Sequence, residues 1–210
     1  MKIYNEISIH HLGGIRDNPY LSTLDFTAEQ LNLAHKAEWE FKSLYTGKYG
    51  GYNFFCDKNG KITQFRAIGE ETAAVKRRNQ DVLSFAFAGN FNKFNGQSVD
   101  QPTLLQLVAY KNFIIKLFEK EYSGWIILPN TEVQLTISGI NPHRFYTQTE
   151  CYGNSLDNEF CRKDLRIYLN EKITLIQKLI SLYQKLILIL YPQKLEGISL
   201  TSCYLQDNRN

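Results

Sequence analysis

Cysteine is scarce in this sequence, with four residues among 210 and no Cys-x-x-Cys pair. This number and spacing exclude a disulfide scaffold and a structural cysteine-rich zinc module. Long apolar runs are also missing: the longest purely apolar stretch, residues 186–191, is far too short to span a membrane. The first residues lack the basic, apolar and small-residue segments of a secretory signal peptide. We therefore expect synthesis in the cytoplasm and no transmembrane segment.

A strong excess of one charge is missing as well. The 24 Lys and Arg residues against 21 Asp and Glu leave a formal charge of +3, too small to indicate nucleic-acid binding. Hydrophobic residues make up 43% and charged residues 21%, which is typical of soluble globular proteins and excludes disordered, collagen-like and multi-spanning membrane proteins. The length suits one domain with a small appendage. The 13 Tyr, 13 Phe and 2 Trp residues suit a groove that contacts sugars or extended peptides.

Strand and helix patterns alternate along the first three quarters of the chain. Thr27 and Gln30 form a capping-box pattern at the start of a predicted helix, and Asn59-Gly60 predicts a hairpin turn. The predicted strands are residues 2–10, 51–56, 61–66, 82–88 and 131–138, and the predicted helices are residues 27–41, 98–122 and one from about residue 156. The order predicts an α/β fold, with a single mixed β-sheet flanked by helices.

Three residues could bind a metal. His10 ends the first predicted strand, and His143 and Cys151 lie eight residues apart in one loop. Catalytic zinc takes three protein ligands and keeps a fourth position open for water. On spacing alone this reading is the weaker one, because a lone His or Cys more often packs in the core or lies on the surface.

The surrounding residues strengthen the zinc hypothesis. Short motifs follow one another in a fixed order: Ile9-His10-His11, Gly51-Tyr52-Asn53-Phe54, Ala88-Gly89-Asn90-Phe91, His143-Arg144 and Thr149-Glu150-Cys151-Tyr152-Gly153-Asn154. With these motifs the chain resembles the zinc-dependent N-acetylmuramoyl-L-alanine amidases of the type-2 class, which include phage amidase lysozymes and peptidoglycan recognition proteins. The resemblance covers about residues 1–169, which we take as a zinc amidase domain.

The resemblance implies a cofactor, a reaction and a set of site residues. Zn²⁺ would be held by His10, His143 and Cys151, with Tyr52 and Thr149 as catalytic residues. Bacterial peptidoglycan would be the substrate, cut at the amide between the lactyl group of N-acetylmuramic acid and L-alanine, as by a phage or prophage lysin that acts on the cell wall once released. The residues expected to contact substrate are Asn53, Arg66, Asn79 and Trp39.

Plainer interpretations stay open beside this one. Tyr52 could be a core aromatic, Thr149 a turn hydroxyl and Trp39 a packing residue. We expect His11 to point to the other face of its strand and Cys56 to be a small buried hydrophobe. Ala74 stands where the family usually has a substrate-binding His, and Ala86 stands where some cytoplasmic relatives have a Glu. The alternative function is a module that binds muropeptides without cutting them.

The tail, residues 170–210, lies beyond the resemblance. Within residues 170–191 apolar side chains recur at alternating four- and three-residue steps, which predicts an amphipathic C-terminal helix with a coiled-coil seam. The helix could pack back on the first domain, self-associate or dock on another protein. Three lysines, Lys172, Lys178 and Lys185, argue against a membrane span.

Overall fold

The computed structural model describes residues 1–15, 17–146 and 158–190. The chain divides into two compact units, Met1–Arg166 and Ile167–Asn210. The helix α3 (Asn158–Leu190) runs across this division, and residue 169, the expected domain boundary, lies within the helix.

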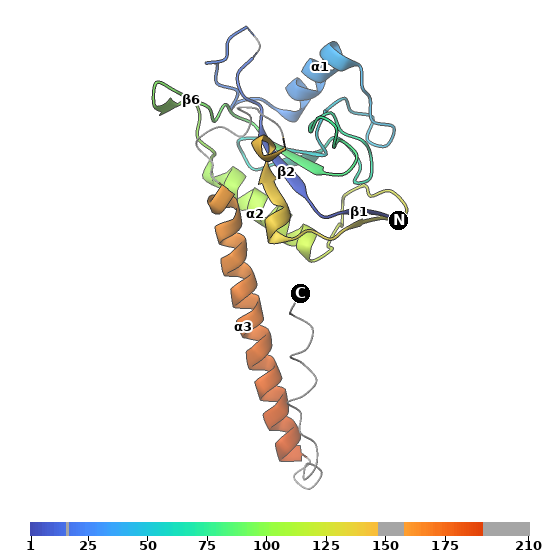
Figure 1. Cartoon of the computed structure of the whole chain (residues 1–210), viewed down its shortest axis with the longest axis vertical. Helices are drawn as coiled ribbons and strands as arrows, with labels where there is room; N and C mark the ends of the chain where they lie inside the picture. The colour runs from blue at the N-terminus through green and yellow to red at the C-terminus, as the bar shows by residue number, and fades with distance from the viewer. Residues whose placement is uncertain (16, 147–157, 191–210) are drawn as a thin grey trace. The chain divides into compact units, whose positions relative to one another are not determined.

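A five-stranded mixed sheet forms the centre of the first unit (Figure 1). Its strand order is β4-β3-β5-β2-β9, and all neighbours are parallel except the antiparallel β3–β4 pair. The strands are β2 (Ile7–His11), β3 (Phe54–Cys56), β4 (Ile62–Gln64), β5 (Leu83–Phe87) and β9 (Ile140–Pro142). The predicted mixed sheet is confirmed, and so is the hairpin around Asn59-Gly60, which joins β3 to β4.

Two short pairs of strands accompany this sheet. The first is parallel and joins β1 (Lys2–Tyr4) to β8 (Thr131–Val133), and the second is antiparallel and joins β6 (Lys93–Phe94) to β7 (Gln97–Ser98). The prediction of one strand over residues 2–10 was therefore wrong. The chain breaks at residues 5–6, because Tyr4 pairs with β8 whereas Ile7 pairs with β5 and β9. The predicted strand 131–138 also ends early, at Val133, and the 3-10 turn η1 (Ile137–Gly139) leads into β9.

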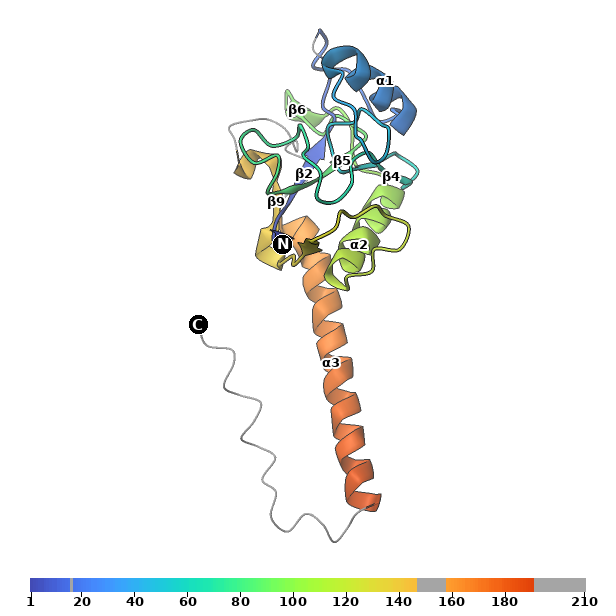
Figure 2. The same cartoon turned by 90° about the vertical axis from the view of Figure 1, so that its right-hand side faces the viewer.

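Helices cover both faces of the central sheet (Figure 2). Side chains alternate between the two faces of a strand, so neighbouring residues enter different cores. Phe54 and Phe85 pack against Phe113 of α2 (Leu104–Phe118), whereas Phe55 and Ala86 belong to a second core with Leu31 of α1 (Ala28–Trp39).

Capping boxes start both of these helices. The Thr27 hydroxyl accepts from the Gln30 N–H, and the Gln30 side chain accepts from the Thr27 N–H, as predicted. The same arrangement between Thr103 and Gln106 starts α2 at Leu104. The predicted start at Ser98 was wrong because residues 97–98 form β7 and Pro102 precedes the cap.

The second unit is described through its part of α3. Every residue from 170 to 186 is exposed, the large apolar side chains among them. Among the helices that the structure describes, none is both long and apolar enough to cross a membrane.

Candidate active site

His10 and His143 meet at the ends of two neighbouring parallel strands. Ile9 of β2 pairs with Pro142 of β9, and each His is the next residue along its strand direction. His143 opens the 3-10 turn η2 (His143–Phe145). The two imidazole rings lie 4.4 Å apart between centroids. The sheet register therefore brings together two side chains separated by most of the domain's sequence.

Both imidazoles are held in the neutral form. Burial, together with the neighbouring His143 and His11, lowers the pKa of the fully buried His10 well below 6.5. Burial also lowers the pKa of the half-buried His143. A neutral imidazole is the form that binds zinc, and two rings this close can each offer a nitrogen to one ion.

The remaining expected ligand, Cys151, and the expected catalytic Thr149 lie outside the described residues. Within residues 1–15, 17–146 and 158–190 no group of three His, Cys, Asp or Glu side chains could hold a metal ion. Ala86 is the β5 residue paired with His10, so that strand position carries a methyl group rather than a carboxylate. The described chain thus supplies two of the three donors that the sequence predicted, and their chemistry fits zinc.

Aromatic rings extend from this pair to the surface. Tyr52 lies 5.1 Å from His10 between ring centroids, His35 lies 5.9 Å from Tyr52, and Trp39 lies 4.3 Å from His35. We call Trp39, His35, Tyr52, His10 and His143 the ring row. Trp39 is 41% exposed whereas His10 is 1% exposed, so the row leads from solvent to the buried carboxyl ends of β2 and β9.

The peptide group between Gly50 and Gly51, just ahead of Tyr52, is clamped at both ends. The Gly50 carbonyl accepts from Arg66 Nε at 2.8 Å, and the Gly51 N–H of the same peptide donates to His35 Nδ1 at 3.0 Å. We call this arrangement the peptide clamp. Its acceptor requires a neutral His35, and burial together with the positive charge of Arg66 lowers the pKa of His35 to about 4.

A close approach explains the glycine at position 51. A Cβ atom there would lie 2.8 Å from the Trp39 ring, which packs over the Gly51 backbone. The role of His35 was not predicted from the sequence. The local sequence hints at this role only by placing His35 four residues before Trp39 on the helix, with the pair Gly50-Gly51 in the loop that comes later.

Two residues expected to contact substrate are instead part of the fold. Arg66 is completely buried: besides Gly50 it donates to the Phe41 carbonyl, lies 3.5 Å from the Glu70 carboxylate and stacks on the Phe41 ring. Asn53 is 1% exposed, and its amide donates to the Ala67 carbonyl while its oxygen accepts from the Ser84 N–H. Because these polar groups are buried and already bonded to the backbone, we correct both assignments to structural roles.

Asn79 and Trp39 keep surface that a ligand could reach. The Asn79 side-chain oxygen accepts from the Val75 N–H at 2.7 Å and closes the loop that contains the buried Ala74. Trp39 is exposed at the outer end of the ring row. Their contact with substrate stays a prediction.

The second His of the strand faces the other core, as expected. His11 Nδ1 accepts from the Phe91 N–H at 2.9 Å, and its ring stacks on Phe91. Cys56 is fully buried, and burial raises the pKa of its thiol to about 12. Both are packing residues.

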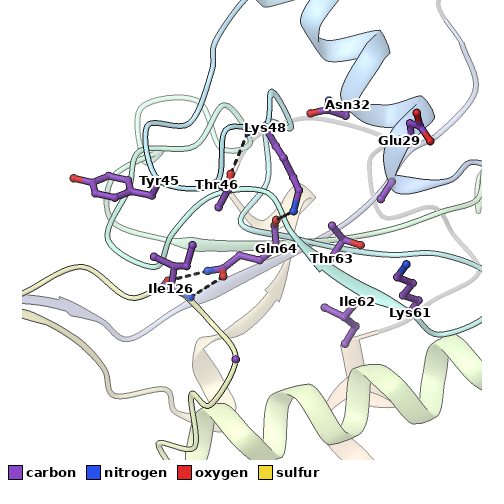
Figure 3. Close-up of a pocket in the computed structure, with 12 residues that line it drawn as sticks. Glu29, Asn32, Tyr45, Thr46, Lys48, Lys61, Ile62, Thr63, Gln64 and Ile126 are labelled. Atoms are coloured by element: carbon purple, nitrogen blue, oxygen red, sulfur yellow. Dashed lines mark hydrogen bonds between the residues drawn. The ribbon is translucent and has the colours of Figure 1, made fainter.

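A separate pocket of about 770 Å³ lies between the start of α1 and the edge strand β4 (Figure 3). Lys48 donates to the Gln64 carbonyl, and the Gln64 side chain bonds both backbone groups of Ile126. These internal bonds engage Lys48 and Gln64, while Glu29, Lys61 and Thr63 also line the pocket. No ring-row residue lines this pocket.

Three solved structures share this fold at low sequence identity. The N-acetylmuramoyl-L-alanine amidase LysC from Clostridium intestinale URNW aligns with a TM-score of 0.54 and 22% identity over 78% of this chain and 85% of its own. The Ph2119 endolysin of a Thermus scotoductus bacteriophage aligns with a TM-score of 0.51 and 17% identity, over the same shares. Drosophila peptidoglycan recognition protein SD aligns with a TM-score of 0.50 and 18% identity, over 73% of this chain and 76% of its own. No protein-family model matches the sequence, and no curated protein sequence does. The likenesses show a shared mixed α/β fold.

Proposed function

We propose that this protein is a zinc-dependent amidase of bacterial peptidoglycan, which cuts the bond between the muramic acid lactyl group and L-alanine. The supporting observation is the meeting of His10, His143 and Tyr52 at the end of strands β2 and β9. The fold is shared with an N-acetylmuramoyl-L-alanine amidase and a phage endolysin, so action on the cell wall as a phage or prophage lysin is consistent with both.

In this proposal His10, His143 and Cys151 hold the metal. Zinc in such a site acts as a Lewis acid and lowers the pKa of water to about 7. The sheet positions both imidazoles before any ligand binds, and burial keeps them unprotonated. Little reorganisation is then needed on binding.

Tyr52 and Thr149 serve the reaction through hydrogen bonds. Tyr52 is 5.1 Å from the His10 ring, where its phenol can orient the attacking water. The Thr149 hydroxyl donates to the oxygen of the scissile carbonyl as negative charge develops, a contact typically worth about 10²–10³ in rate. Trp39 and Asn79 contact the sugar or stem peptide.

A second candidate is a module that binds muropeptides without hydrolysis. One observation favours it: Ala74 is buried where the family usually places a substrate-binding His. A non-catalytic module would need a surface that binds muropeptides but not a complete metal site.

Digestion of purified peptidoglycan tests the two candidates. New L-alanine amino termini are measured by mass spectrometry with and without a zinc chelator, and bound zinc is measured by elemental analysis. We expect chelator-sensitive release by the wild type and none by Cys151→Ser or His10→Ala. Tyr52→Phe should keep its zinc and lose at least about 100-fold in rate, whereas the exposed control Tyr20→Phe should be unchanged. Zinc-loaded protein that binds walls but releases nothing would overturn catalysis and favour the binding module.

A further inference from the structure

The part of α3 in the second unit carries a broad apolar stripe. Eight large apolar side chains of this helix, between residues 173 and 186, are each 47–65% exposed. They are Ile173, Leu175, Ile176, Leu179, Ile180, Leu182, Tyr183 and Leu186. We call them the α3 stripe.

The stripe follows a seven-residue period. Ile173, Ile176, Ile180 and Tyr183 are separated by alternating steps of three and four residues, which is the a and d pattern of a coiled coil. Leu175, Leu179, Leu182 and Leu186 form a second seam with the same alternation beside the first. Two adjoining seams let one helix contact two neighbours. The remaining positions carry polar residues such as Thr174, Gln177, Lys178, Ser181 and Lys185.

The exposed area matches what a stable interface buries. At about 1.5–3 kcal/mol per fully buried large side chain and about 25 cal/mol per Å², eight such side chains correspond to roughly 480–960 Å² of apolar surface, of which about half, roughly 260–530 Å², is exposed on the single helix. A specific protein interface buries about 800 Å² per partner, of which roughly 60% is apolar, so the exposed apolar area of the stripe is of the size that one such interface covers. A helix also gains most of its stability from packing its apolar face.

We propose that the α3 stripe binds further copies of this chain and forms a homo-oligomeric helical bundle. The regular heptad spacing favours a helical partner over a lipid surface, because a lipid surface requires an apolar face but no seven-residue register. Ile occupies both a positions (Ile173 and Ile180) and one of the two d positions (Ile176), a composition closer to that of three- or four-stranded coiled coils than of two-stranded ones. This assembly goes beyond the proposed amidase activity and does not depend on it.

Sedimentation equilibrium of the full chain tests the proposal. We expect a mass that rises with concentration to a multiple of 24.4 kDa. In Ile176→Gln/Ile180→Gln the dissociation constant should rise by at least about 100-fold. The matched control Thr174→Gln/Lys178→Gln has the same four-residue spacing on the polar face and should associate like the wild type. Circular dichroism of both variants checks that the first unit stays folded.

Three outcomes would overturn the proposal. The first is a wild type that stays monomeric up to its solubility limit. The second is equal weakening of association by both double variants, which would show that the stripe is not the interface. The third is a monomer that co-sediments with vesicles of phosphatidylcholine and phosphatidylglycerol, which would assign the stripe to a membrane surface. None of these results bears on peptidoglycan hydrolysis, which the digestion assay measures separately.

Discussion

Acidification should weaken the fold through His35, and the effect can be isolated by substitution. His35 must stay neutral because its Nδ1 accepts the Gly51 N–H, and its pKa in the folded protein is about 4. In the unfolded chain the pKa of a His is about 6.5. Between these two values the unfolded state binds a proton that the folded state does not, so the free energy of unfolding falls as pH falls.

The size of this loss follows from the two pKa values. Each tenfold change in proton affinity is worth about 1.4 kcal/mol, so the full difference for His35 corresponds to about 3 kcal/mol. The contribution is fully present above pH 6.5 and is lost by about pH 4. Because the His35 side chain is 8% exposed, screening by solvent reduces this value only modestly.

Urea unfolding of two variants from pH 7 to pH 4.5 measures the effect. His35→Asn keeps an acceptor near the Nδ1 position but does not titrate, whereas His35→Leu loses the acceptor as well. Subtracting the curve of His35→Asn from that of the wild type cancels the contributions of His10, His143 and the carboxyl groups. We expect the difference to change by about 2–3 kcal/mol across this range. Parallel curves for the wild type and His35→Asn would refute the reasoning.

Three further predictions concern the packing around the site. Arg66→Met removes the donor to Gly50 and leaves Glu70 without its cation, so the free energy of unfolding in urea should fall by about 3–5 kcal/mol; a loss near zero would contradict the peptide clamp. Thr103→Ala removes the cap of α2 and should cost about 1 kcal/mol in the same assay, with no effect expected from the exposed Ser181→Ala. Iodoacetamide should label Cys56 no faster than the protein unfolds, because its thiol is buried and its pKa is raised to about 12. Mass spectrometry that found rapid labelling of Cys56 in the native protein would disprove this last prediction.

Local patterns predicted the parts of the fold that local interactions determine. The two threonine capping boxes obey short-range rules, although only the one at Thr27 was recognised. The apolar run at residues 82–88 was predicted as a strand, and all five residues of β5 are buried. The predicted strand end at His10 falls one residue before the end of β2 at His11, and the structure brings His143 to His10.

Long-range pairing determines the parts that the sequence did not reveal. Strand β9 has three residues and contains Pro142, which has no N–H to donate, so no local pattern indicates a strand. It forms because β2 offers it a parallel partner at the sheet edge. The structural roles of Arg66 and His35 were hidden for a similar reason. Their partner is a backbone peptide in a loop, and only the tertiary fold brings the three together.

The two histidines are positioned by strands that differ in how many hydrogen-bonded neighbours hold them in the sheet. Strand β2 is hydrogen-bonded on both sides, by β5 and β9, whereas β9 forms the edge of the sheet. Edge segments open locally at lower free energy than central ones, so His143 belongs to the part of the site that can separate while His10 stays in place. A ligand that binds both rings would join an edge strand to the middle of the sheet. Its binding energy would then appear as slower amide exchange in β9, while β2, already protected by its two neighbours, would hardly change.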